Sequence, residues 1–412
     1  MFLPLYIDPG TGSMLFSLFI GIVAAASFGF RALYLKMKFI FSGGRAENPE
    51  NEKNIPFVIF SDHKRYWNVF KPICDEFERR GIDAVFYTAS PDDPALAAEY
   101  RHVSAEYIGE GNRPYARLNM LHADIVLATT PGLDVYQWKR SKNVKYYVHI
   151  PHTVDDLSVY RMFGLDYYDA VLTCGQNQVD LIRKIESLRP GITAKEIISI
   201  GSVPLDSLKK RFDSAEPVAE NAVPVVLVAP SWGKSGILSR YGARLLAALR
   251  KTSYKIIIRP HPQTVVSEKD ILNPLAEEFS DFEWNYDNDN FDVLNKADML
   301  ITDFSGIIFD YSLVFGKPLI YADTDFDTLP YDADWLDEPQ WAIRILPQIG
   351  IQLKEADFEN IGNVIRNALS SRLLEEGRSK VRQGCWENQG KSTVSAVDYL
   401  VKKQAELIEK KL

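Results

Sequence analysis

"ADMLITDFSGIIFDYSLVFGKPLIY", residues 297–321, decides the fold, because two short apolar runs flank a stretch with helical spacing. The first run ends at Asp303. Ser305 and Gly306 then open the helical stretch, which closes at Gly316 and leads into the second run. Strand, helix and strand at this spacing are typical of a parallel sheet with a crossover helix on one face. This stretch therefore predicts an α/β fold.

The same alternation extends through the rest of the chain and predicts two domains. Apolar runs typical of strands occupy residues 57–62, 82–90, 123–130, 145–152, 168–175, 225–231, 254–262, 297–306 and 317–325. A polar, proline-bearing stretch at 209–223 interrupts them and is typical of a linker. We expect two doubly wound Rossmann-like domains facing a cleft, with ligands at the carboxyl ends of the strands. The predicted boundaries are 1–45 for an N-terminal segment, 46–208 and 224–400 for the domains, and 401–412 for the end of a C-terminal helix.

Composition excludes several classes of protein. The 412 residues are 46% hydrophobic and 25% charged, which fits a large globular enzyme. The net charge of −8 argues against a general nucleic-acid-binding protein, because no basic surplus is present to neutralise phosphates. The three cysteines are far apart and have no CxxC spacing, so neither a disulfide framework nor a thiolate zinc site is indicated.

The N-terminal segment departs from the pattern of a soluble domain. Residues 13–30 carry no charge over a length close to the hydrocarbon core of a bilayer, which predicts one transmembrane helix. A helix lying in the membrane interface and a cleaved signal peptide are alternatives, although the leader lacks the basic residues of a signal peptide. Only Asp8 is charged before the run. Because basic residues follow it, we expect the large C-terminal part in the cytoplasm. These residues are Arg31, Lys36, Lys38 and Arg45.

Two candidate anion-binding side chains follow the strand predicted within residues 254–262. Arg259 and His261 alternate with Pro260 and Pro262, and the prolines keep this turn extended. A guanidinium offers a forked donor for phosphate oxygens, and a histidine can donate to the same anion or move a proton. Alternatively, the prolines end the strand and the two side chains cap nearby carbonyl groups.

A second candidate anion site opens the helix after Asp303. The free N–H groups at such a helix start attract anions, with Ser305 and Gly306 facing the ligand. A carboxylate would repel phosphate, so we expect Asp303 to turn back onto backbone N–H groups and brace the loop. Asp310 lies about one turn further on and is within reach of ribose or polyol hydroxyls. Plain capping of the helix is the alternative.

Two histidines end the strand predicted at 145–152. His149 and His152 are candidates for proton transfer, and either can also be a buried histidine that the backbone satisfies. Together with Asp155 or Asp156 they are a weaker candidate for a metal site, because the context of a helical metal motif is missing. We therefore expect no bound metal. The glycine spacing of residues 384–393 does not fit a phosphate-binding P-loop, so ATP hydrolysis is not indicated.

Several motifs together resemble a known family. They are "ISIGSVPLDSL" (198–208), "PVVLVAPSWGKSG" (224–236), "RPHP" (259–262), "DMLITDFSGIIFDY" (298–311), "GKPLIYADTD" (316–325) and "NQGKST" (388–393). In this order they resemble the CDP-glycerol glycerophosphotransferase family of teichoic-acid polymerases and primases, over roughly residues 140–395. Gln389 stands where the family usually has an aspartate.

The resemblance implies a glycosyltransferase-B architecture with an acceptor domain at 46–208 and a nucleotide-donor domain at 224–400. The implied enzyme transfers a polyol phosphate, most simply glycerol phosphate from CDP-glycerol, to a hydroxyl of a membrane- or lipid-linked acceptor or polymer of the cell envelope, without a cofactor. His149 is the better positional match to the histidine of the family's Trp-His-Gly segment, the proposed general base, and His152 is the alternative. The Trp and Gly of that segment are missing here.

The resemblance also implies how the donor is held. Arg259, His261 and the Ser305–Gly306 helix start would hold its pyrophosphate, with His261 able to take part in proton transfer. A nucleotide-sugar glycosyltransferase of the same architecture and a membrane-tethered, non-catalytic relative remain alternatives.

Overall fold

The computed structural model describes residues 54–409, except 161–162, 190, 219–220, 288 and 324–337. From Ile55 onward these residues form one compact unit. The predicted transmembrane run at 13–30 and its basic flank lie outside the described residues. Within the described part of the chain, no helix combines the length and apolar character needed to span a bilayer.

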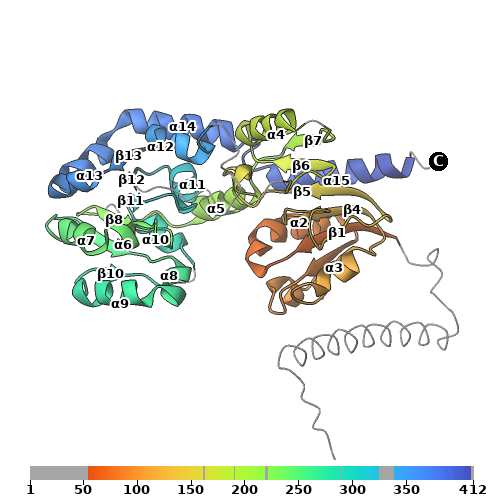
Figure 1. Cartoon of the computed structure of the whole chain (residues 1–412), viewed down its shortest axis with the longest axis horizontal. Coiled ribbons are helices and arrows are strands. Elements are labelled where there is room, and N and C mark those ends of the chain that lie inside the picture. The colour runs from red at the N-terminus through yellow and green to blue at the C-terminus, as the bar shows by residue number, and fades with distance from the viewer. Residues whose placement is uncertain are drawn as a thin grey trace, which may run out of the picture. The chain divides into compact units, whose positions relative to one another are not determined.

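The part we call the first half is built on a seven-stranded, entirely parallel sheet in the order β3-β2-β1-β4-β5-β6-β7 (Figure 1). The strands are β1 (Ile55–Ser61), β2 (Ala84–Thr88), β3 (Val103–Tyr107), β4 (Ala123–Ala128), β5 (Val144–His149), β6 (Ala170–Thr173) and β7 (Glu196–Ser199). β4 and β6 are buried along their whole length, as expected for central strands covered on both faces.

Helices connect and cover these strands. They are α2 (Trp67–Arg80), α3 (Arg113–Leu118), α4 (Gln176–Leu188) and α5 (Val203–Ser214), with 3-10 turns η2 (Lys64–Tyr66), η3 (Pro94–Ala97) and η4 (Leu157–Val159). α2 buries Phe70 and Phe77 in the core shared with β1 and β2. It ends at Gly81, whose φ of 67° is the left-handed conformation that favours glycine at a helix C-terminus.

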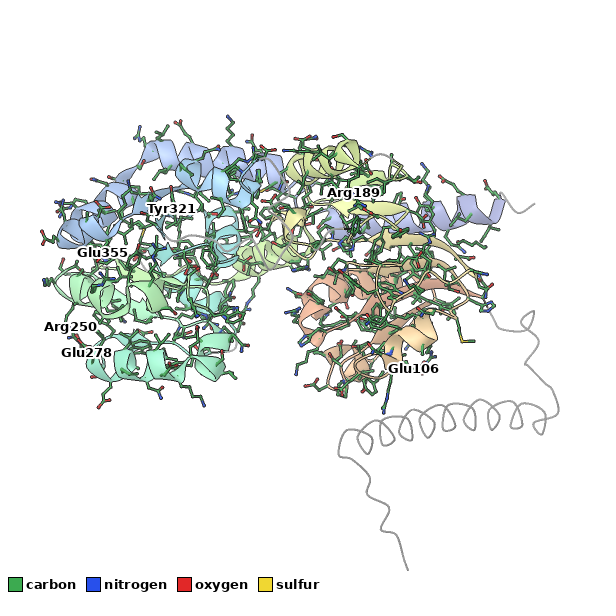
Figure 2. All side chains as sticks on the ribbon, in the orientation of Figure 1. Glu106, Arg189, Arg250, Glu278, Tyr321 and Glu355 are labelled. Carbon is green, nitrogen blue, oxygen red and sulfur yellow. The ribbon has the colours of Figure 1, made fainter. Side chains whose placement is uncertain are left out.

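The second half repeats the topology with six parallel strands in the order β10-β9-β8-β11-β12-β13 (Figure 1). The strands are β8 (Val225–Val228), β9 (Lys255–Ile258), β10 (Glu283–Trp284), β11 (Met299–Thr302), β12 (Leu319–Ala322) and β13 (Gly350–Leu353). The helices are α6 (Ile237–Arg240), α7 (Gly242–Arg250), α8 (Pro262–Ser267), α9 (Lys269–Glu278), α10 (Phe291–Lys296), α11 (Ile307–Phe309), α12 (Trp341–Ile349), α13 (Ile361–Ser370) and α14 (Arg372–Cys385), with the 3-10 turn η8 (Glu355–Asn360). Side chains fill the space between each sheet and its helices (Figure 2).

The stretch at 297–321 folds as the sequence predicts, because β11 and β12 flank a helical segment and pair in parallel. The segment begins as α11 and continues as a π-helical turn, η5 (Asp310–Phe315). Gly316 ends it with φ 69°, again the left-handed conformation. The prediction of an α/β fold with two doubly wound parallel sheets is therefore confirmed.

The last helix, α15 (Ser392–Glu409), packs on the sheet of the first half, where Ala396 and Val397 join its core. Asp206 fixes the start of α15 by accepting hydrogen bonds from the backbone N–H of Gly390 at 2.8 Å and of Ser392 at 2.9 Å. The predicted domain boundaries do not include this return to the first half, and they stay a prediction.

A close backbone contact accompanies the return. The Glu387 N–H donates to the Cys174 carbonyl at 2.9 Å. Gly201 has φ +93°, and a Cβ at this position would lie 2.2 Å from the Glu387 carbonyl oxygen. Position 201 therefore requires glycine both for its backbone conformation and for space.

Candidate functional site

The candidate donor site lies at the carboxyl ends of β8, β9 and β11, which are neighbours in the second sheet. The Arg259 N–H donates to the Val228 carbonyl at 2.8 Å, and the Ala229 N–H donates to the Ile301 carbonyl at 3.0 Å. The three strands therefore end at nearly the same level, and their loops begin side by side. In a doubly wound sheet this is the edge where ligands bind.

Arg259 is half-buried directly after β9, and residues beyond β10 hold part of its guanidinium. One terminal nitrogen donates to the Asn285 side-chain oxygen and the other to the Asp287 carbonyl at 2.8 Å. Burial lowers the pKa of Arg259, and the carboxylates of Asp287 and Asp289 oppose this effect. A guanidinium has five N–H donors, so these contacts orient the group and leave donors for an anion.

His261 caps α8 with one ring nitrogen. Its Nδ1 accepts a hydrogen bond from the Gln263 N–H at 3.1 Å, so the proton of the neutral ring is on Nε2. Burial lowers the pKa of His261, with Asp303 and Glu268 opposing the shift. In this tautomer Nε2 is a hydrogen-bond donor suited to an anion.

Asp303 accepts backbone hydrogen bonds, as expected, but the loop that it braces is the one after β8 and not the start of α11. Its carboxylate accepts from the Ser231 N–H at 2.9 Å and from the Ile237 N–H at 2.9 Å. The side chain is buried, and burial raises its pKa while these backbone bonds oppose the rise. These hydrogen bonds of Asp303 therefore stabilise the loop after β8.

The loop braced by Asp303 spans residues 231–236 and contributes side chains that the sequence analysis did not select. Trp232 is 53% exposed and Lys234 is also exposed. Glu268 supports the middle of the loop by accepting from the Gly233 N–H at 2.9 Å. Gly233 and Gly236, shortly after the apolar run of β8, are the feature of the sequence that could have predicted this loop.

Ser305 and Gly306 follow Asp303 at the start of α11. Ser305 is half-buried and Gly306 is exposed, with open space where a Cβ would be. Asp310 lies at the start of η5, and burial raises its pKa to about 7. Its carboxyl is therefore partly protonated near neutral pH. The expected hydrogen bond between Asp310 and a hydroxyl of the ligand stays a prediction.

In the first half, His149 is the last residue of β5 and is fully buried. Its ring packs edge-on against Tyr160 and Tyr168, with centroids 5.4 and 5.0 Å away, and Nε2 shares a hydrogen bond with the Tyr160 hydroxyl at 3.2 Å. Burial lowers the pKa of His149 to about 3, with a contribution from His152. The imidazole is therefore neutral at neutral pH.

His152 lies three residues further on, in the loop after β5, and is partly exposed. Its ring packs against Tyr66 with centroids 5.0 Å apart. Burial and the nearby Arg65 guanidinium lower its pKa to about 4. It too is neutral at neutral pH and can accept a proton, although a low pKa makes it a weak base.

The two aspartates that follow have structural contacts. Asp156 accepts from the Ala342 N–H at 2.8 Å, at the start of α12, and Asp155 accepts from the Asp156 N–H at 2.6 Å. Burial raises the pKa of Asp155 to about 7 and that of Asp156 to about 6. In the described ranges, no group of three or more His, Cys, Asp or Glu side chains is arranged to hold a metal ion.

The structure thus gathers the candidates into two sets. The donor candidates after β9 and β11 lie at one edge of the second sheet, and the two histidines lie together after β5. Among the described residues no hydrogen bond or ion pair joins the two sets. A cavity of about 440 Å³ among α4, α12 and α14 is lined by Asp156, but by none of the donor candidates and by neither histidine.

Two parallel Rossmann-like sheets, each with polar side chains at its carboxyl edge, give the chain a fold like that of glycosyltransferase-B structures. The fold is similar to the structure of the wall teichoic acid polymerase TagF, with a TM-score of 0.57 and 16% identity over 92% of this chain and 98% of that one. It is also similar to a UDP-GlcNAc 2-epimerase from Neisseria meningitidis, with a TM-score of 0.52 and 14% identity over 84% and 99% of the two chains. At these identities the likeness is one of fold.

Sequence comparison finds a match to one family over part of the chain. The model of the CDP-glycerol:poly(glycerophosphate) glycerophosphotransferase family matches residues 191–335. The minor teichoic acid biosynthesis protein GgaB of Bacillus subtilis (strain 168) is 29% identical over 154 residues, which are 31% of this chain and only 16% of that protein. The predicted resemblance to this family is confirmed, and the comparisons support the prediction of a transferase.

Proposed function

We propose that the protein transfers a polyol phosphate, most simply glycerol phosphate from CDP-glycerol, to an acceptor hydroxyl in the synthesis of a cell-envelope polymer. One observation carries the proposal. The family match at 191–335 spans the strand-end loops that hold Arg259, His261, Asp303 and Ser305. These loops meet at the sheet edge where a nucleotide donor binds in doubly wound folds.

The donor's pyrophosphate would lie over the carboxyl ends of β8, β9 and β11. Arg259 offers the guanidinium donors that Asn285 and Asp287 leave unused, and His261 offers its Nε2–H. Ser305 and the backbone N–H groups beside it complete the anion site. Charge neutralisation and positioning then account for most of the catalysis, as in phosphoryl transfers generally.

The acceptor hydroxyl would lose its proton to His152. The freed oxygen attacks the β-phosphorus of the donor, the bond to CMP breaks, and CMP leaves with the electron pair. His152 is preferred to His149 because it is partly exposed, whereas two tyrosine rings enclose His149 in the core. His149 would then serve to support the loop that carries His152.

The acceptor is proposed to be lipid-linked or a polymer end at the membrane. The uncharged run at 13–30 would anchor the protein as a single-pass membrane protein with its catalytic part in the cytoplasm. Such an anchor raises the effective concentration of enzyme and acceptor at the bilayer surface.

One observation favours a second candidate, a membrane-tethered relative that has lost its chemistry. The better positional match to the family's base, His149, is fully buried. An activity measurement separates the two candidates. The full chain is incubated with a panel of CDP-polyols and nucleotide sugars plus membrane lipid extract, and release of CMP, UMP or UDP is measured.

CMP release that depends on both a CDP-polyol and the extract supports the proposal. UDP or UMP release points instead to a nucleotide-sugar glycosyltransferase. Absence of any nucleotide release across the panel, from a protein that is folded, would contradict the transferase proposal and favour the non-catalytic relative.

A further inference from the structure

Five buried polar side-chain atoms that have no hydrogen-bond partner among the described residues gather at one edge of the first sheet. They are Asp62 Oδ1, Thr129 Oγ1, Thr130 Oγ1, His149 Nδ1 and His152 Nδ1. A buried polar atom that lacks a partner costs about 1–3 kcal/mol, so such atoms are few in native proteins. Five of them in one place call for partners from outside the described residues, which water or a polar ligand can supply.

The sheet register explains why these atoms converge. β1, β4 and β5 are neighbours, and Phe60, Ala128 and His149 form one row across them. Asp62 therefore leaves the sheet beside Thr129 and Thr130, at the level where β5 ends. The gap between β1 and β4 is also where the strand order reverses, the position at which this kind of sheet binds ligands.

Contacts among the side chains support this arrangement. The Tyr66 ring, which follows Asp62 by four residues, packs on His152. The Tyr168 hydroxyl donates to the Thr130 carbonyl at 2.5 Å and helps to fix that loop. Burial raises the pKa of Asp62, and the neighbouring Thr130 hydroxyl and Arg65 guanidinium partly offset the rise, which places both groups beside the Asp62 carboxyl.

The chemistry of the atoms suggests the class of ligand. A carboxylate accepts hydrogen bonds, threonine hydroxyls both donate and accept, and neutral imidazole nitrogens do one or the other. This mixture suits a molecule with several neighbouring hydroxyl groups. Asp62 would repel a phosphate in the same position, whereas Arg65 is exposed next to it and would attract one.

We propose that Asp62, Thr129 and Thr130 bind the terminal polyol of the acceptor, with Asp62 accepting a hydrogen bond from the hydroxyl next to the one that His152 deprotonates. Arg65 then faces the phosphodiester that joins this polyol to the rest of the acceptor. This inference rests on the proposed function and adds to it residues that select a polyol as the acceptor. Asp62 acts by positioning the acceptor and does not take the reacting proton.

Binding of three small probes to the full chain, without any donor, tests the inference. Glycerol 3-phosphate carries both a diol and a phosphate, propyl phosphate carries only the phosphate, and glycerol carries only the diol. The histidine ring C–H resonances report binding, with that of His152 assigned from the spectrum of His152→Gln. Because no turnover is needed, the result does not depend on the identity of the nucleotide donor.

We expect glycerol 3-phosphate to shift the His152 resonance and to bind about 10-fold or more tightly than propyl phosphate, the usual effect of a hydrogen bond to a charged group. Asp62→Asn should abolish this preference, and Thr130→Val should reduce it. Arg65→Gln should instead reduce the preference for glycerol 3-phosphate over glycerol. Asp83→Asn is the matched control, because Asp83 is an exposed acid in the same half that pairs with His102.

Equal affinity of the wild-type protein for glycerol 3-phosphate and propyl phosphate would overturn the inference. So would an unchanged preference in Asp62→Asn and Thr130→Val. If Asp62→Asn fails to fold in a thermal melt, Thr130→Val alone decides. A preserved probe preference in a protein that releases no nucleotide would refute the proposed reaction and leave the polyol site standing.

Discussion

Replacing Asp303 with alanine tests whether this residue supports the donor loop or contacts the ligand. The substitution removes the acceptor for two backbone N–H groups, those of Ser231 and Ile237, each 2.9 Å from the carboxylate. Leaving a buried donor unpaired costs about 1–3 kcal/mol. The Ile237 bond is buried and the Ser231 bond only partly so, which predicts a loss of about 1–3 kcal/mol or somewhat more in the free energy of unfolding. That is a large share of the typical stability of about 5–15 kcal/mol.

Urea denaturation measures this loss, and calorimetry with CDP-glycerol measures donor affinity in the same variant. Asp323→Ala is the matched control, because Asp323 follows the neighbouring strand β12 but is exposed. We expect the control to change stability by less than about 0.5 kcal/mol. Ser305→Ala should lower donor affinity by the value of one neutral hydrogen bond, about 0.5–1.5 kcal/mol, with little change in stability.

The reasoning fails if Asp303→Ala keeps the stability of the wild-type protein and yet abolishes turnover. Asp303 would then contact the ligand directly, and a metal ion bridging it to the phosphates would have to be tested by adding and chelating divalent ions.

Three further predictions follow from other parts of the molecule. Gly201→Ala should lower the melting temperature by several degrees, because its Cβ would meet the Glu387 carbonyl; an unchanged melting curve would show that the return of the chain to the first half is looser than described. The pKa of His149 is lowered from 6.5 to about 3, so between these values the unfolded state binds a proton that the folded state does not. The free energy of unfolding should therefore fall by up to about 1.4 kcal/mol per pH unit as the pH drops below 6.5. His149→Gln should flatten this slope in urea titrations at pH 7, 6 and 5. Deleting residues 1–45 should turn a membrane-sedimenting protein into one that stays in the supernatant, and a truncated protein that still pellets with membranes in high salt would refute the anchor.

The central strands could be predicted from the sequence because they are continuous apolar runs that end in turn residues. β8, β9, β11 and β12 fall inside the predicted runs for that reason. The strands β3, β7, β10 and β13 were missed, since they are short and carry exposed or half-buried side chains that weaken the apolar signal. The destination of α15 was also missed, because its own pattern gives an apolar face but not the sheet on which that face packs.

The candidate site was predictable only in part. The position of a residue at a strand end follows from the pattern, which is why Arg259 and Asp303 lie where expected. The direction in which a side chain points does not follow from the pattern, because a shift of one residue along a strand turns the side chain to the opposite face of the sheet. His149 therefore lies in the core while His152, beyond Pro151, reaches the surface. Asp62 follows β1, whereas Thr129 and Thr130 follow β4, so only the folded sheet brings their unpaired atoms together.

The central claim is that the second half binds a CDP-activated donor at the ends of β8, β9 and β11. Calorimetry of the full chain with CDP-glycerol tests it most directly, comparing wild-type protein with Arg259→Ala and with the control Arg250→Ala. Arg250 lies on α7 at the outer surface of the same half, near Glu278 (Figure 2), and pairs with Asp281.

The account predicts saturable binding to the wild-type protein, about 10-fold or more weaker binding to Arg259→Ala, and unchanged binding to Arg250→Ala. No binding of CDP-glycerol to the folded wild-type protein, or equal affinity in Arg259→Ala and the wild type, would contradict it.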